Sequence, residues 1–194
     1  MRFNSALACG VFALVLLAGC AGTISRPATE PGQTVQPLFL VDHGRHSSVV
    51  LVREDESMVR FAYGDWEWYA MGRSGPLRTL PTLFARTRGA LGRQQLEGPA
   101  TAENVRRQIA VVIREVHLLE ADSERSRLLK ERLEHRFSAG LDELHYNKEF
   151  DLEFVPDPRP YTLFYNSNHV VADWLSEAGI ETGGNPVWGR WNLR

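Results

Sequence analysis

The two cysteines of this 194-residue chain, Cys9 and Cys20, both lie near its start, so they limit how the chain can be held together. They follow a basic Arg2, and the apolar run at 11–17 is shorter than the about 20 residues that span a bilayer. A basic start, an apolar core and small residues before a break are typical of a secretory signal. We expect residues 1–19 to be removed, which leaves no cysteine pair for a disulfide, so a hydrophobic core must hold the fold.

The end of this segment, Leu17-Ala18-Gly19-Cys20, resembles a bacterial lipobox. The resemblance implies cleavage before Cys20 and acylation of its sulfur and its new amine. The alternatives are a plain signal peptide that contains a cysteine, and an uncleaved anchor. Several acyl chains on one residue would anchor the protein firmly. Ala21 is not the Asp that resembles an inner-membrane retention signal, so we expect an outer-membrane location facing the periplasm.

The charge of the chain excludes some partners. The formal net charge is −2, and removal of Arg2 makes it more negative. A mildly acidic chain has no footprint for nucleic acid and no polybasic patch for anionic lipid. We therefore expect membrane attachment through the lipid on Cys20. The expected envelope location makes peptidoglycan or an envelope protein a candidate partner, and we expect no cofactor.

Residues 21–36 are rich in Thr, Ser, Pro, Gly and Gln and predict a flexible tether, with one folded domain at 37–194. Within the domain, apolar and β-branched runs predict strands. They lie at 38–41, at 47–53 and 58–63 (a hairpin broken by Gly64 and Asp65), at 89–96, at 150–155 and 161–165 around a proline loop, and at 187–193.

Periodic apolar positions predict helices at 101–118, at 122–137 and at 170–178, the last ended by Gly179. The first two form a predicted helical hairpin at about 101–137, and a short helix is also predicted at 81–87. Strands followed by helices, then strands and a helix, indicate the α+β class with a mainly antiparallel sheet.

Three polar constellations are candidates for chemistry. In the first, His43 and His46 precede a buried strand, where rigid backbone would suit a general base. The alternative is a turn whose histidines are solvated or hydrogen-bonded. In the second, Asp65 could orient an imidazole or cap a turn, and Trp66 and Trp68 could line a groove or pack in a core.

The third constellation is Asn166, Ser167, Asn168 and His169 at the start of the last predicted helix. Free backbone amides at a helix start can stabilise an oxyanion, so a nucleophile would fit there. Ser and Asn are also the usual helix caps, which is the structural alternative.

Together these motifs resemble a bacterial family, domain-of-unknown-function family 2459. The resemblance rests on Gly44-Arg45-His46-Ser47-Ser48, Tyr63-Gly64-Asp65, and the segment from Tyr161 through Ala178-Gly179. That family resembles circularly permuted papain-like hydrolases of the NlpC/p60 type, with an early His and a late Cys at a helix start. The resemblance implies that fold, His46 as base and Asp65 as orienting residue, and it places Ser167 where the family has Cys.

Two functions follow, and they remain open at this point. With an altered nucleophile, the favoured one is a lipid-anchored binding or scaffolding protein that keeps a papain-like groove with Trp66, Trp68, Asn168 and His169. The other is a hydrolase of envelope amides or esters that uses Ser167 and His46. A metal-dependent activity through His43, His46 and His169 is a weaker alternative, because the spacing of His43 and His46 alone is weak evidence for a metal site.

Overall fold

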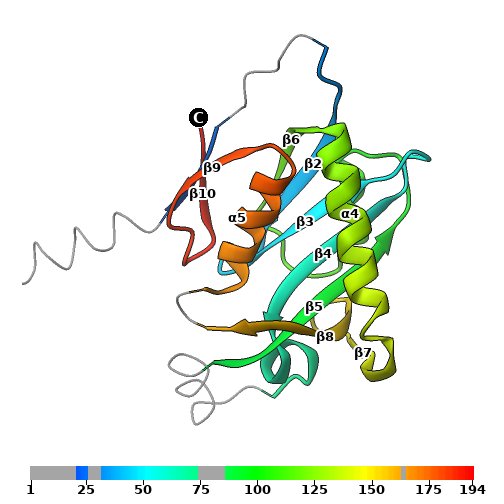
Figure 1. Cartoon of the computed structure of the whole chain (residues 1–194), viewed down its shortest axis with the longest axis vertical. Helices are drawn as coiled ribbons and strands as arrows, with labels where there is room; N and C mark the ends of the chain where they lie inside the picture. Colours follow the sequence, from blue (N-terminus) through cyan, green and yellow to red (C-terminus); the bar gives the residue numbers. More distant parts are fainter. Residues whose placement is uncertain (1–20, 26–31, 74–85, 163–164) are drawn as a thin grey trace, which may run out of the picture.

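The computed structural model describes residues 21–25, 32–73, 86–162 and 165–194, and Figure 1 shows two sheets with helices packed on the larger one. The described strands pair antiparallel except for β1 with β10, so the predicted α+β class with a mainly antiparallel sheet is confirmed. In sheet order, the strands of the large sheet are β6 (Glu115–Asp122), β2 (Val35–Asp42), β3 (Ser47–Val52), β4 (Met58–Asp65), β5 (Thr87–Leu96), β8 (Leu152–Tyr161) and β7 (His145–Asn147).

The β3–β4 hairpin forms the middle of this sheet, as its apolar and β-branched sequence predicts. Every residue of both strands is buried. Since successive side chains point to opposite faces, each strand contributes to two separate layers. Val49 and Leu51 pack on one face, and Val50 and Val52 pack on the other.

Two helices, α4 (Ser123–Ser138) and α5 (Ser167–Glu177), cover one face of the large sheet, which we call the α4/α5 face (Figure 1). The predicted caps and stripes of both helices are confirmed. The Asp122 side chain caps α4 by accepting a hydrogen bond from the backbone N–H of Arg125. Gly179 follows α5 with a φ of 88°, a backbone conformation that favours glycine. The side chains packed on the sheet include Leu129, Leu133, Phe137, Val170, Val171, Trp174 and Leu175.

The predicted helical hairpin is wrong in its first half. The helix α3 is short, Ala102–Gln108, and the chain turns at Ile109 and then forms edge strand β6. Residues 116–121 match a strand as well as a helix, because buried His117, Leu119 and Ala121 alternate with exposed residues. Pairing along eight residues of β2 decides between the two patterns.

The predicted proline loop at 156–160 is also wrong, because Leu152–Tyr161 is a single strand, β8. Pro156, Pro158 and Pro160 alternate, so their missing N–H groups all face the same edge. Strand β7 pairs with β8 only at residues 152–154, and past that point β8 has a partner on its other side alone, β5. Likewise Gly64 and Asp65 do not break the hairpin but belong to β4.

The predicted tether is wrong at both of its ends. Ala21–Ser25 forms β1, the middle strand of a small sheet with β9 (Glu181–Gly184) and β10 (Arg190–Leu193). Val35 already pairs with Asp122 in the large sheet. The indole of Trp191 packs on the α4/α5 face and donates to the Ser47 hydroxyl at 2.8 Å, which joins the small sheet to the large one. Cys20, the segment at 26–31 and most of the predicted helix at 81–87 lie outside the described residues.

A pair of substitutions separates this topology from the predicted helix. Val112 would face inward on a helix over 101–118, but it is 82% exposed here. We expect Val112→Asp to change the free energy of unfolding by less than about 0.5 kcal/mol. The matched control Val105→Asp, which buries a carboxylate under α3, should cost about 3 kcal/mol or more. Equal losses in chemical denaturation would contradict the topology.

Candidate functional site

The first part of the predicted site is the start of α5, where Ser167 is the first helical residue. Asn166 caps the helix, since its side-chain oxygen accepts from the Asn168 N–H at 3.0 Å. The His169 ring completes a capping box by accepting from the Asn166 N–H, and its other nitrogen lies 3.0 Å from Asn185 Oδ1. Ser167 is only 3% exposed, so its hydroxyl is not presented in an open cleft.

The second part is the histidine pair before β3. The His43 and His46 rings stack with their centroids 5.0 Å apart. The His46 ring also makes edge-to-face contacts with two aromatic rings. The ring centroids lie 5.8 Å apart for Tyr69 and 6.1 Å apart for Phe150. Tyr69 and Phe150 pack against Phe154 and its neighbours, on the face of the large sheet opposite to α4 and α5.

Arg60 anchors this pair from within the sheet, although it is only 1% exposed. Its guanidinium donates to Ser48 Oγ at 3.1 Å, to Gln94 Oε1 at 3.1 Å and to His43 Nε2 at 3.2 Å. The Nδ1–H of His43 donates to the Val112 carbonyl at 2.8 Å. Ser48 and Arg60 occupy the same set of alternate positions as Val50, so the cluster belongs to the opposite face.

Burial and the Arg60 cation set the protonation of both histidines. Burial, and then Arg60, lower the pKa of His46 to about 4. Burial, Arg60 and His46 together lower the pKa of His43 to about 3, against the Val112 hydrogen bond. Burial also lowers the pKa of Arg60 to about 10, which leaves it charged at neutral pH. Both imidazoles are therefore neutral near pH 7.

The structure brings the start of α5 to the backbone before β3 but does not join the two side chains. Asn168 Nδ2 donates to the Arg45 carbonyl at 3.0 Å. Within the described residues, His46 makes no hydrogen bond to Ser167 or Asp65. Its ring packs on the opposite face, whereas α5 packs on the α4/α5 face. A hydrogen-bonded Ser167–His46 pair is therefore not present in this structure.

A second serine–histidine contact exists, at Ser48 and His43, whose Oγ and Nε2 atoms lie 3.0 Å apart. It has the length of a nucleophile–base pair. However, Ser48 is 0% exposed and its oxygen also accepts from Arg60 Nε. A substrate cannot reach it, so this contact stabilises the fold.

The remaining predicted residues serve local structure. Asp65 caps the short π-type turn η1 (Trp66–Ala70) through the Trp68 N–H at 2.8 Å, and it also accepts from the Thr87 hydroxyl. Trp66 is 7% exposed, packs in the core and lies under the Arg88 guanidinium. Because Trp66 is buried, the described residues do not form the predicted groove lined by both tryptophans.

The metal alternative has no support in the geometry. His43 and His46 stack on each other, while His169 is engaged with Asn166 and Asn185. Among the residues that the structure describes, no three His, Cys, Asp or Glu side chains converge in a way that could hold a metal ion.

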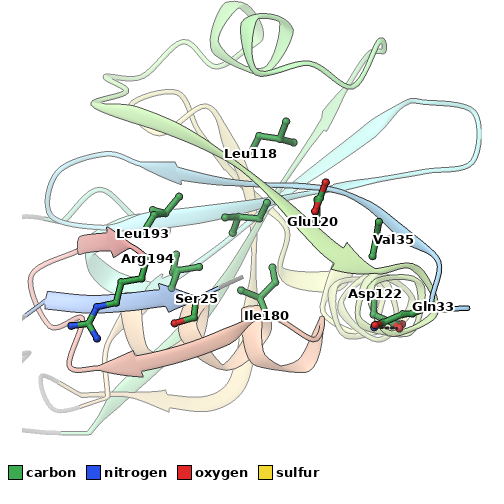
Figure 2. Close-up of a pocket in the computed structure, with 11 residues that line it drawn as sticks. Ser25, Gln33, Val35, Leu118, Glu120, Asp122, Ile180, Leu193 and Arg194 are labelled. Atoms are coloured by element: carbon green, nitrogen blue, oxygen red, sulfur yellow. Dashed lines mark hydrogen bonds between the residues drawn. The ribbon is translucent and has the colours of Figure 1, made fainter. Parts of the chain in front are cut away.

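A pocket lies elsewhere, between the edge strand β6 and the small sheet (Figure 2). Its volume is about 420 Å³, in the range of small-ligand sites. Six of its eleven lining residues are aliphatic, and Glu120, Asp122 and Arg194 supply charge. Figure 2 shows Leu118 and Glu120 on β6 on one side of it and Ser25, Ile180 and Leu193 on the other.

Among the residues that the structure describes, no strand pairs with the outer edge of β6 along this pocket. Strand β6 ends the large sheet, with β2 as its neighbour on one side. The Ser123 N–H donates to the carbonyl of Thr34, the residue just before β2, so it points toward β2. The Asp122 N–H points the other way and donates to the carbonyl of Ala178. The alternation of an antiparallel ladder therefore turns the N–H and C=O groups of Leu118 and Glu120 outward. Leu118 is 58% exposed.

Comparison of the chain with protein-family models, with curated proteins and with solved structures gave no match. None of the described helices has both the length and the apolar character needed to span a bilayer.

Sequence reasoning missed Arg60, the pocket and the exposed Trp188. A cationic residue within a predicted buried strand indicates a buried polar network, and Arg60 is such a residue. The pocket had no sequence signal, because residues 24–25, 118–122 and 193–194 are far apart along the chain.

The neutral histidines make stability depend on pH. Their pKa values are depressed in the folded protein, so below pH 6.5 the unfolded chain binds more protons. We expect the free energy of unfolding to fall between pH 6.5 and 4, by on the order of a few kcal/mol.

Denaturation of His43→Gln across this range checks the origin of the effect. It should show a shallower pH dependence, whereas His135→Gln, at an exposed position of α4, should keep the wild-type slope. An unchanged slope in His43→Gln would exclude the buried pair as the cause.

Proposed function

We propose that this protein is a lipid-anchored protein of the cell envelope that binds an extended polypeptide segment and does not hydrolyse it. The lipobox-like Cys20 supports the anchor, and Ala21 after it supports the outer membrane facing the periplasm. The packing of the His46 ring and of α5 on different faces of the large sheet, with Ser167 buried, argues against hydrolysis. The observation that carries the binding function is the outer edge of β6 beside a partly apolar pocket.

The resemblance to permuted papain-like hydrolases belongs to the same proposal. An early histidine before a central strand and a late serine at a helix start agree with the order expected for that fold. Cysteine nucleophiles work as thiolates, and a serine hydroxyl with its far higher pKa depends on a well-placed base. Since His46 packs against aromatic rings on the opposite face, we propose a papain-like scaffold without turnover.

The chemistry of the pocket favours a peptide strand as its ligand. The outward N–H and C=O groups of Leu118 and Glu120 provide the hydrogen bonds by which an extended segment adds to a sheet edge. Ile24, Ile180 and Leu193 provide apolar contacts for alternate side chains of that segment. The edge and the apolar lining together match a strand better than a compact polar molecule, which would leave these backbone groups unused.

Hydrolysis through Ser167 is the second candidate, because Ser167 is the first residue of α5 and so lies at the positive end of the helix dipole. The binding proposal predicts that a fluorophosphonate probe will not label Ser167 in the folded protein. Intact mass spectrometry of wild type and of Ser167→Ala after probe treatment checks this. A one-probe adduct on wild type that Ser167→Ala lacks would establish an active hydrolase and contradict the proposal.

A photo-crosslinking amino acid at position 118 tests the peptide site in intact cells. We expect a protease-sensitive adduct of higher mass, which the added substitution Glu120→Pro abolishes. Proline is tolerated on an edge strand where its N–H would face outward, so Glu120→Pro removes a ladder donor without unfolding the sheet. The same crosslinker at Leu144, 44% exposed, is the control.

Equal adducts at 118 and 144, or an adduct that survives Glu120→Pro, would contradict strand addition at β6. The absence of any adduct at 118 in cells would contradict a polypeptide ligand at this pocket. Thermal denaturation of Glu120→Pro verifies that the domain is still folded.

A further inference from the structure

The folded domain begins one residue after the proposed lipid. Ala21 opens β1 and pairs in register with Arg190 of β10, and its carbonyl accepts from the Asn185 N–H at 3.3 Å. Consecutive Cα atoms lie about 3.8 Å apart, so a lipid on Cys20 would be attached one residue from the first strand of the small sheet. No span of flexible chain separates Ala21 from the position that would carry the lipid.

The surface around Ala21 has the composition of a membrane interface. Trp188 is 52% exposed and sits in the turn that precedes β10, closed by the Gly189 N–H, which donates to the Pro186 carbonyl at 2.8 Å. Arg190 is exposed directly beside Ala21. A Cβ on Gly189 would lie 3.0 Å from the Arg45 backbone, so exposed Arg45 borders the same turn.

These three side chains suit the headgroup region of a bilayer. Tryptophan concentrates at membrane–water interfaces because its ring is apolar and its N–H is polar. Arginine side chains beside it can pair with lipid phosphates. The turn also fixes Trp188 relative to β1, so an interface contact costs little ordering of the chain.

We propose that Trp188, Arg190 and Arg45 form a docking surface that seats the domain on the periplasmic leaflet of its bilayer, next to the lipid anchor. The proposal rests on the lipidation of Cys20 in the proposed function. The occupant is the lipid headgroup region, because an anchor one residue from Ala21 brings this surface to a bilayer before any other partner.

The docked orientation keeps the pocket accessible. Ile24 and Ser25, which line the pocket, lie at the opposite end of β1 from Ala21. Four residues of strand span about 13 Å. The bilayer and the peptide therefore contact different ends of the small sheet, and binding of one leaves room for the other.

Fluorescence of the full-length lipoprotein in vesicles tests this surface. The vesicles contain phosphatidylethanolamine and phosphatidylglycerol with brominated acyl chains, which quench only nearby indoles. We expect wild type to be quenched relative to unbrominated vesicles and Trp188→Phe to lose most of that quenching. Phenylalanine keeps an apolar ring at the interface, so this variant removes the signal while preserving the docking. The control Trp68→Phe, on η1, should be quenched like wild type.

Two further measurements distinguish the docking from the anchor. Mass spectrometry of the mature N-terminal peptide shows whether Cys20 is acylated, and flotation shows whether the protein stays with the vesicles. An acylated protein that floats but is not quenched, or that is quenched equally as Trp188→Phe, overturns the docking surface while the anchor stands. A protein without acyl chains overturns both proposals.

Discussion

Every side chain of β3 is buried, and this constraint organises the rest of the molecule. A strand buried on both faces needs two covering layers, and the two layers here differ in chemistry. The odd positions face α4 and α5 in an apolar core, whereas Ser48 on the other side joins Arg60 and His43 in a polar network. The same alternation places the His46 ring and the start of α5 in different layers.

The structure also depends on the attachment of the small sheet to the large one. Trp191 packs against Gly22 so closely that a Cβ at position 22 would lie 2.7 Å from the indole, and its N–H reaches Ser47 in the large sheet. A polar segment with no apolar period therefore becomes a strand through tertiary contact. This contact also sets the small sheet beside β6, where the pocket lies, and within the small sheet Arg190 pairs with Ala21.

The parts of the fold that could be predicted are those whose periodicity has one interpretation. The β3–β4 hairpin, the stripe of α4 and the Gly179 stop of α5 belong to this group. The apolar residues in 109–122 are spaced in a way that fits either a helix or a strand, and pairing with β2 decides between the two. For the candidate site, sequence located the helix start and the histidines correctly, but the face on which each side chain lies depended on the register of the folded sheet.

The central claim is that His46 is a buried, neutral side chain that is uncoupled from Ser167. An NMR titration of the His46 imidazole in wild type and in Ser167→Ala tests it most directly. The account predicts a pKa of about 4 that Ser167→Ala leaves unchanged. A titration near the ordinary histidine value of about 6.5 that shifts in Ser167→Ala would contradict it, since it would show that the two side chains form a working pair.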